Sequence, residues 1–285
     1  MTESVLYMLL EISRVPDAAE YLPEIDRADA DPDFCCDVSK NSDNIYAVCY
    51  DGEVVGLLSF FEDSDAYVYV YIFPKHRKKG YGYLAERRCE EMCSSQCQAL
   101  FTSYNEANEV AGRLAIKCGF IKQHESVVMT YEGERFDLPP LPIRNHRDED
   151  FIKAYTLSAE AFHVMRLETG HDPNSTPYTP DDEIRQHCLE TAHERYVYLL
   201  GDEIIGCAHI DGAEIDNVAI QVEHQGRGYG RELVKFLCNE ILDKGIGKPF
   251  LYCLVCNKKA FGLYKSIGFK ETRRHAYVKK ELRKD

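Results

Sequence analysis

The chain of 285 residues is 45% hydrophobic and 29% charged, a globular composition long enough for two domains. No apolar run approaches the ~18 residues that a membrane span requires, and acids stand near the start where a signal peptide carries bases, so we expect a cytoplasmic protein without a membrane partner. The formal net charge of −14 is concentrated in residues 1–137, which hold 13 Lys+Arg against 25 Asp+Glu, and without a clustered basic surface we expect no nucleic-acid partner.

The first half of the chain is predicted to form an antiparallel meander followed by helices. Runs of β-branched and aromatic residues predict strands, and Asp51-Gly52 is a hairpin turn signal. A glycine-rich loop then opens a helix, and a later short helix ends at Gly119-Phe120. The predicted elements are strands 45–50, 53–58 and 66–72, helix 83–93 and strand 99–104.

The second half repeats this order of elements after a proline-rich segment at 131–142. We therefore expect a boundary near 137, with domains at 1–137 and 138–285. The second domain opens with a strand at Ile143, and its helices are expected to begin after Asp150 and at Thr179-Pro180-Asp181-Asp182. The repeated elements are strands 196–200, 203–208, 214–220 and 250–255, helix 231–242 and a short helix ending at Gly268-Phe269.

Twelve cysteines lie mainly inside apolar runs of a chain without a secretion signal, so we expect free and mostly buried thiols. Cys253 and Cys256 form a CxxC, and Cys89, Cys93 and Cys97 recur every four residues on a predicted helix. Because no second CxxC or His pair at zinc-finger spacing accompanies them, we interpret them as structural thiols and expect no metal site.

The loop Gln225–Gly230 opens directly into a helix, and its backbone N–H groups are predicted to bind a pyrophosphate. A nucleotide-triphosphate loop would need Gly-Lys followed by Ser or Thr, which is missing here. A dinucleotide fingerprint would need GxGxxG in a βαβ unit, whereas this glycine pattern follows an antiparallel meander. Both alternatives are disfavoured.

The loop pattern Gln225-x-x-Gly228-x-Gly230 resembles that of the GNAT superfamily of acyl-CoA-dependent N-acyltransferases, and Arg77-x-x-Gly80-x-Gly82 resembles it too. A second motif, Asn257-x-x-Ala260-x-x-x-Tyr264-x-x-x-Gly268-Phe269, resembles the last helix of that family. The resemblance implies two tandem α/β domains, each a mixed, largely antiparallel sheet flanked by helices. It also implies acetyl-CoA as cosubstrate.

By this resemblance the second half carries the cofactor site. The backbone of the strand before the loop would pair with the pantetheine arm, the loop amides would hold the pyrophosphate, and the last helix would face the cofactor. The implied cofactor-binding residues are Val218, Ala219, Ile220, Gln225, Gly226, Arg227, Gly228, Tyr229, Gly230, Arg231 and Asn257.

Amide formation from a thioester also needs a base for the alkylammonium, whose pKa is about 10.4, and a proton for the departing thiolate. The resemblance assigns the second task to Tyr264. Glu214 resembles the catalytic glutamate that some family members carry on this strand, and strand alternation places Asp216 on the same face as a reserve candidate. The sequence leaves the choice between the two acids open.

Alignment of the first half puts Ala115 where Tyr264 stands and Ala66 where Glu214 stands. We therefore expect a first domain that has lost catalysis and serves as scaffold, dimerisation surface or substrate wall. The expected acceptor is a primary amine of a small molecule or peptide, and His171, Asp172 and Tyr178 are candidates to contact it. The competing hypothesis is a non-catalytic CoA-binding sensor or interaction protein.

Overall fold

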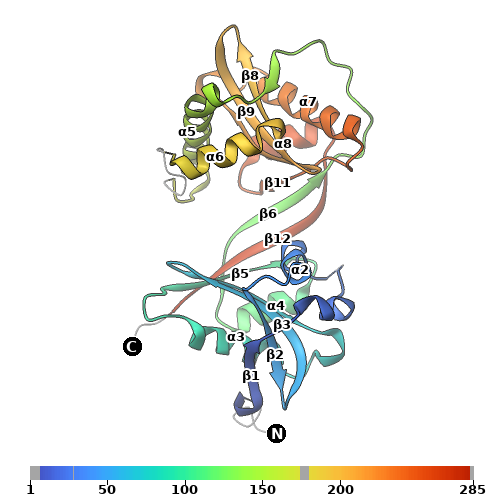
Figure 1. The fold of residues 1–285 in the computed structure, drawn as a ribbon, viewed down its shortest axis with the longest axis vertical. Helices are drawn as coiled ribbons and strands as arrows, with labels where there is room; N and C mark the ends of the chain where they lie inside the picture. The colour runs from blue at the N-terminus through green and yellow to red at the C-terminus, as the bar shows by residue number, and fades with distance from the viewer. Residues whose placement is uncertain (1–6, 28, 174–179, 283–285) are drawn as a thin grey trace. The chain divides into compact units, whose positions relative to one another are not determined.

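The fold is taken from a computed structural model, which describes residues 7–27, 29–173 and 180–282 (Figure 1). The chain divides into two compact units. Unit 1 comprises residues 1–125 and 274–285, and unit 2 comprises residues 126–273. Among the described residues, no helix is long and apolar enough to cross a membrane.

Unit 1 is built on a sheet with strand order β1-β2-β3-β4-β5-β12, antiparallel throughout except between β4 and β5. The β2–β3 hairpin turns at Asp51 and Gly52, which both adopt positive φ, the conformation that such a two-residue turn needs. Its strands are β1 Leu10–Arg14, β2 Ile45–Tyr50, β3 Glu53–Glu62, β4 Ala66–Ile72, β5 Ala99–Asn105 and β12 Lys270–Glu281, and its α-helices are α2 Pro32–Ser39, α3 Tyr81–Met92 and α4 Glu109–Lys117.

Unit 2 has a sheet with order β6-β11-β10-β9-β8-β7, again antiparallel except for one parallel pair, β10 with β11. Its strands are β6 Ile121–Thr130, β7 Ile143–Asn145, β8 Arg195–Leu200, β9 Glu203–Asp211, β10 Glu214–Ile220 and β11 Phe250–Leu254, and its α-helices are α5 Phe151–Thr169, α6 Asp182–Glu190, α7 Tyr229–Lys244 and α8 Lys258–Ile267. The paired elements confirm the predicted repeat.

The two repeats exchange their final strands. After α4 the chain enters β6, whose residues 126–130 pair with β11 in unit 2. After α8 it enters β12, whose residues 275–281 pair with β5 in unit 1. A single boundary at residue 137 therefore does not describe the two units. The strand after α4 completes the sheet of unit 2, and the strand after α8 completes the sheet of unit 1.

Each sheet carries helices on both faces, as layered α/β packing requires. In unit 2 the apolar stripe of α7, with Leu233, Leu237 and Ile241 fully buried, packs against one face, while α5 packs against β9 and β10. The start of α5 is fixed by the buried Asp150, whose carboxylate accepts two hydrogen bonds from Arg144 at 2.6 and 2.9 Å. The other predicted helix start was Thr179, which lies outside the described residues. In the structure Asp181 is the N-cap residue of α6.

Candidate functional site

A cleft of about 690 Å³ opens in unit 2 where β10 and β11 diverge. The two parallel strands pair only at Glu214 and Phe250, so their remaining backbone groups do not meet. On its other side β10 carries a β-bulge, because Asp216 pairs with His209 while Ala219 pairs with Cys207. Asn217 in this bulge has φ +51°, a left-handed conformation that Asn tolerates better than most residues. The bulge therefore lies in the part of β10 that lines the cleft.

The predicted loop forms the mouth of this cleft. Gly226 and Gly228 have φ of +74° and +98°, and a Cβ at either position would project into open space. Gly228 caps α7 without a side-chain hydrogen bond, so the first N–H groups of the helix remain available to an anion. Gln225 holds the loop against the strand by donating from Nε2 to the carbonyl of Ile220 at 3.0 Å.

Most of the predicted cofactor residues line this cleft. Val218, Ala219, Ile220, Gln225, Gly226, Gly228, Gly230, Arg231 and Asn257 are all found there. The other two predicted loop residues are placed differently. Arg227 is exposed, and Tyr229 packs edge-on against His224 and Tyr198, behind the loop. Asn257 also caps α8, because its Oδ1 accepts a hydrogen bond from the N–H of Ala260 at 3.1 Å.

Tyr264 lies at the inner end of the cleft, 8% exposed, with its ring 5.9 Å from that of Phe269. Burial raises the pKa of its phenol, and Cys253 and the charge of Asp216 raise it further. The phenol is therefore protonated at neutral pH and is able to donate its proton into the cleft.

The two candidate bases differ in their position along β10 relative to its pairing with β11. Asp216 lines the cleft, beyond the point where β10 and β11 separate. Glu214 lies where the strands are still paired, opposite Asp211 in the β9–β10 hairpin, and among the described residues it is not part of the cleft lining. The sequence could not distinguish the acids, because strand alternation puts both on the same face.

The first long helix of unit 2 contributes a wall that the sequence analysis did not include. Phe162, Met165 and Glu168 of α5 line the cleft, and Glu168 reaches across to Lys259 with an Nζ–Oε1 distance of 2.6 Å. The predicted acceptor residues are not part of this wall: His171 and Asp172 are described but do not line the cleft, and Tyr178 lies outside the described residues.

Unit 1 contains an equivalent cleft of about 420 Å³, entered through the loop Arg77–Gly82. Its loop is anchored in the same way, since Arg77 donates from Nε to the carbonyl of Ile72 at 2.9 Å. A further contact crosses this cleft: Asp29 accepts from Arg77 Nη2 at 2.7 Å and from Asn108 Nδ2 at 2.5 Å. Asp29 therefore links the loop to the helix that begins after Asn108, and it places a carboxylate beside the loop.

The wall of the unit 1 cleft differs because β4 has no bulge. The ladder from Gly56–Ile72 to Glu62–Ala66 is continuous, so Tyr69 pairs with Ser59 at the position that Asp216 occupies opposite His209. By the same ladder Tyr67, rather than Ala66, stands in the place of Glu214. The alignment of the two repeats in the sequence was therefore wrong by one residue at this point, because the bulge adds one residue to β10 that β4 does not have.

The inner end of the unit 1 cleft also differs. Ala115 replaces the tyrosine, and the carboxyl of Glu86 lines the cavity beside it. Glu86 is 7% exposed and its Oε2 has no hydrogen-bond partner. Burial raises the pKa of this carboxyl to about 8, although nearby Lys280 opposes the shift. This buried group could not be predicted from the sequence, because a glutamate on a helix usually faces solvent.

Comparison with known proteins agrees with the repeat. The model of the Acetyltransferase (GNAT) family matches residues 7–120 and again residues 156–269. A solved GCN5-related N-acetyltransferase from Sphaerobacter thermophilus superposes with a TM-score of 0.69 at 17% identity, covering 96% of each chain. A tandem GNAT protein from the clavulanic acid biosynthesis pathway superposes with a TM-score of 0.63 at 14% identity, covering 97% of this chain and 100% of that one.

Curated relatives match only part of the chain. The [ribosomal protein bS18]-alanine N-acetyltransferase of Escherichia coli K12 is 33% identical over 78 residues, which are 27% of this chain and 53% of that protein. Thialysine N-epsilon-acetyltransferase of Sus scrofa is 33% identical over 57 residues, which are 20% and 34% of the two chains. The chain thus spans about half the length, or less, of these relatives. The family model, in contrast, covers most of both repeats, and the chain belongs to the GNAT family of acetyltransferases.

Proposed function

We propose that unit 2 transfers an acetyl group from acetyl-CoA to a primary amine. The observation that supports this most directly is the convergence, in one cleft, of a helix N-terminus, a bulged strand and the buried phenol of Tyr264. Acetyl-CoA supplies the acyl group as a thioester. The cleft fits such a molecule because the positive-φ glycines leave space at the mouth and no side chain caps the helix.

In this proposal the loop amides of residues 226–230 bind the pyrophosphate, as anions bind at helix N-termini, while the amides of Gln225 and Arg231 bond within the protein. The β11-facing backbone of Val218 and Ala219, which does not pair with β11, binds the amide-containing arm, and Asn257 faces it from α8. Arg227 is exposed and available to a phosphate, whereas Tyr229 supports the loop from behind.

We assign proton donation to Tyr264, because a phenol of raised pKa keeps its proton until a developing thiolate accepts it. We assign the base to Asp216, which lines the cleft, and retain Glu214 as the alternative that the sequence favoured. A carboxylate in this position accepts a proton from the acceptor's ammonium, directly or through one water, and the neutral amine then attacks the thioester carbonyl.

The proposed acceptor is an alkylamine of a small molecule or a peptide. The carboxylate of Asp216 lines the cleft and favours a cationic group, whereas the charge of Glu168 is balanced by Lys259. The named relatives act on the alanine of a ribosomal protein and on the ε-amine of thialysine, and both acceptors carry such an amine. Unit 1 lacks the bulge and the tyrosine, and we propose that it does not carry out transfer.

The test is a screen for release of the CoA thiol, with acetyl-CoA and a panel of amines that includes peptide N-termini, lysine analogues and polyamines. We expect turnover with at least one amine and a loss of roughly 10²–10⁴ in kcat for Tyr264→Phe. Tyr67→Phe, which changes an exposed tyrosine of unit 1, is the matched control and should retain full activity. Binding of acetyl-CoA without transfer to any amine would instead favour the non-catalytic CoA-binding sensor.

A further inference from the structure

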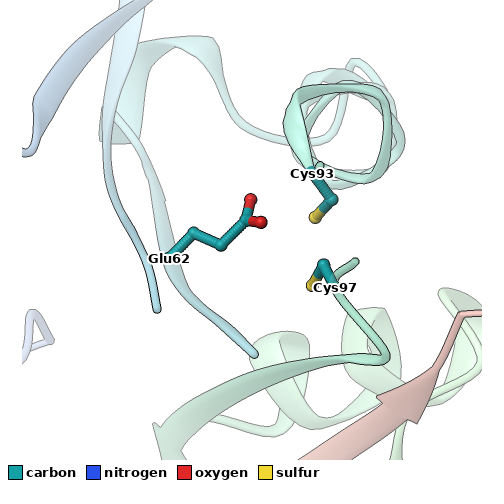
Figure 2. Close-up of side chains that lie close together, drawn as sticks. All are labelled: Glu62, Cys93 and Cys97. Atoms are coloured by element: carbon teal, nitrogen blue, oxygen red, sulfur yellow. The ribbon is translucent and has the colours of Figure 1, made fainter. Parts of the chain in front are cut away.

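Three potential metal-ligating side chains of unit 1 converge away from its cleft. Cys93 ends α3, Cys97 lies four residues further on, and Glu62 ends β3 (Figure 2). One donor atom from each, the two Sγ atoms and a carboxylate oxygen, lies within 4.8 Å of the other two. Figure 2 shows the carboxylate of Glu62 facing the thiol of Cys93, with Cys97 beside them.

These distances suit a tetrahedral metal ion. Zinc binds thiolates at about 2.3 Å and carboxylate oxygens at about 2.0–2.2 Å, so neighbouring ligands of one ion lie about 3.5–3.8 Å apart. Because the donor atoms lie within 4.8 Å of one another, a contraction of at most about 1.3 Å brings them to these separations. Thiolate ligands also select zinc-like ions over calcium or magnesium.

The carboxylate is held in place for this role. Both oxygens of Glu62 accept a hydrogen bond from the backbone N–H of Ser94, at 3.2 and 3.0 Å, in the loop between the two cysteines. Metal-bound carboxylates are commonly oriented by such second contacts. Within the described part of the chain, no Lys, Arg or His forms an ion pair with Glu62, so no cationic side chain balances its charge.

The thiols are placed where a metal would change their state. Cys97 is 3% exposed and Cys93 is half-buried. Their protons point to backbone carbonyls, from Cys93 to Cys89 at 3.3 Å and from Cys97 to Ala99 at 3.4 Å. A divalent ion deprotonates thiols that coordinate it.

The cysteine spacing alone predicted structural thiols, but the structure adds Glu62 to two of them. We propose that Cys93, Cys97 and Glu62 form a site for a zinc-class divalent ion, with a water molecule in the fourth position. Binding forms two metal–sulfur bonds and one metal–oxygen bond and releases two thiol protons to solvent. The ion joins the end of α3 to the end of β3 and so stabilises unit 1. The other group of possible ligands, Glu203, Glu223 and His224, has no thiol and two exposed acids, and it carries no such inference.

The test uses the reduced full-length chain, stripped of metal and titrated with Co²⁺, whose thiolate complexes absorb through sulfur-to-metal charge transfer. We expect one equivalent of Co²⁺ to produce this absorption and Zn²⁺ to displace it. Cys93→Ser and Cys97→Ser should abolish the band, and Glu62→Gln should weaken affinity at least about tenfold while the band remains. Cys36→Ser, which removes an exposed thiol of the same unit, is the control and should bind like the wild type.

The proposal is overturned if Co²⁺ gives no thiolate band, or if the two cysteine variants bind as tightly as the wild type. Recovery of a Cys93–Cys97 disulfide from the metal-free chain, with no metal binding after reduction, would also overturn it. Because Glu62→Gln keeps both thiols, it tests the site even if a cysteine variant does not fold. A rise in the unfolding temperature of the wild type with Zn²⁺, absent in Glu62→Gln, is the second expected result.

Discussion

The clefts of units 1 and 2 share one architecture but differ at each position where chemistry would occur. In both, a residue at the loop entry donates to the strand carbonyl behind it, Arg77 to Ile72 and Gln225 to Ile220. Unit 2 then adds the bulge and Tyr264, whereas unit 1 keeps a regular strand and the bridge made by Asp29. The fold therefore supplies a cleft in each unit, and in our proposal a few side chains decide which cleft is equipped for transfer.

The sharpest test of this difference is the base. We expect Asp216→Asn to lower kcat by roughly 10²–10⁴ at neutral pH, because the amine then loses its proton acceptor. Glu214→Gln should have a much smaller effect, since Glu214 lies where the strands are still paired. The measurement is the rate of CoA-thiol release at saturating amine for both variants. A larger loss in Glu214→Gln would return the role to the residue that the sequence favoured.

The second test concerns Glu86, the buried carboxyl that unit 1 has beside Ala115. Because its folded pKa of about 8 lies above its ordinary value, its contribution to stability is present below pH 4.5 and is lost as pH rises through 8. We expect the free energy of unfolding of unit 1 to fall between pH 6 and pH 9. Glu86→Gln should remove a part of this fall worth on the order of a few kcal/mol.

Urea unfolding of wild type and Glu86→Gln at both pH values measures that difference. Glu109→Gln is the control, since Glu109 is an exposed glutamate of α4 in the same unit, with its Oε2 3.1 Å from Nη1 of Arg113. If wild type and Glu86→Gln show the same change in stability with pH, Glu86 is not a buried titrating group.

A smaller effect is expected from the bridge across the unit 1 cleft. Asp29→Asn removes the carboxylate that pairs with Arg77. The guanidinium of Arg77 is then free to bind a phosphate at the loop. We expect this variant to bind acetyl-CoA in unit 1 about tenfold more tightly than the wild type does, which corresponds to ~1.4 kcal/mol. Calorimetry should then show a second, weaker binding step. An isotherm identical to that of the wild type would exclude Asp29 as the cause of the difference.

The sequence predicted the repeat and its loops because glycines, turn residues and apolar runs act locally. The elements around Gly80 and Gly228 were placed within a few residues. The strand exchange could not be predicted, because residues 121–130 and 270–281 each form the strand after a last helix, and no local pattern decides which sheet each completes. The bulge had a weak local signal, since Asn217 tolerates positive φ, but one polar residue in a strand does not establish an insertion.

The sequence also did not predict the residues that reach the two clefts only through tertiary packing. Glu86 is buried only because α3 packs against the sheet, and Asp29 reaches the loop from a distant segment. Phe162 and Met165 are ordinary helix residues until α5 is placed over β10. Local patterns therefore predict the strands, loops and helices around the site. The side chains that form its walls and supply its charges depend on contacts between residues far apart in the sequence.

The most direct test of the central claim is a calorimetric titration of acetyl-CoA into three full-length proteins: the wild type, Gly80→Val and Gly228→Val. The two glycines are equivalent, with φ of +90° and +98° at the start of α3 and α7, and a side chain at either position costs roughly 1–2 kcal/mol of strain and enters the loop mouth. We predict one tight site in the wild type, unchanged in Gly80→Val and weakened at least about tenfold in Gly228→Val. Tight binding that survives Gly228→Val and disappears in Gly80→Val would contradict the account.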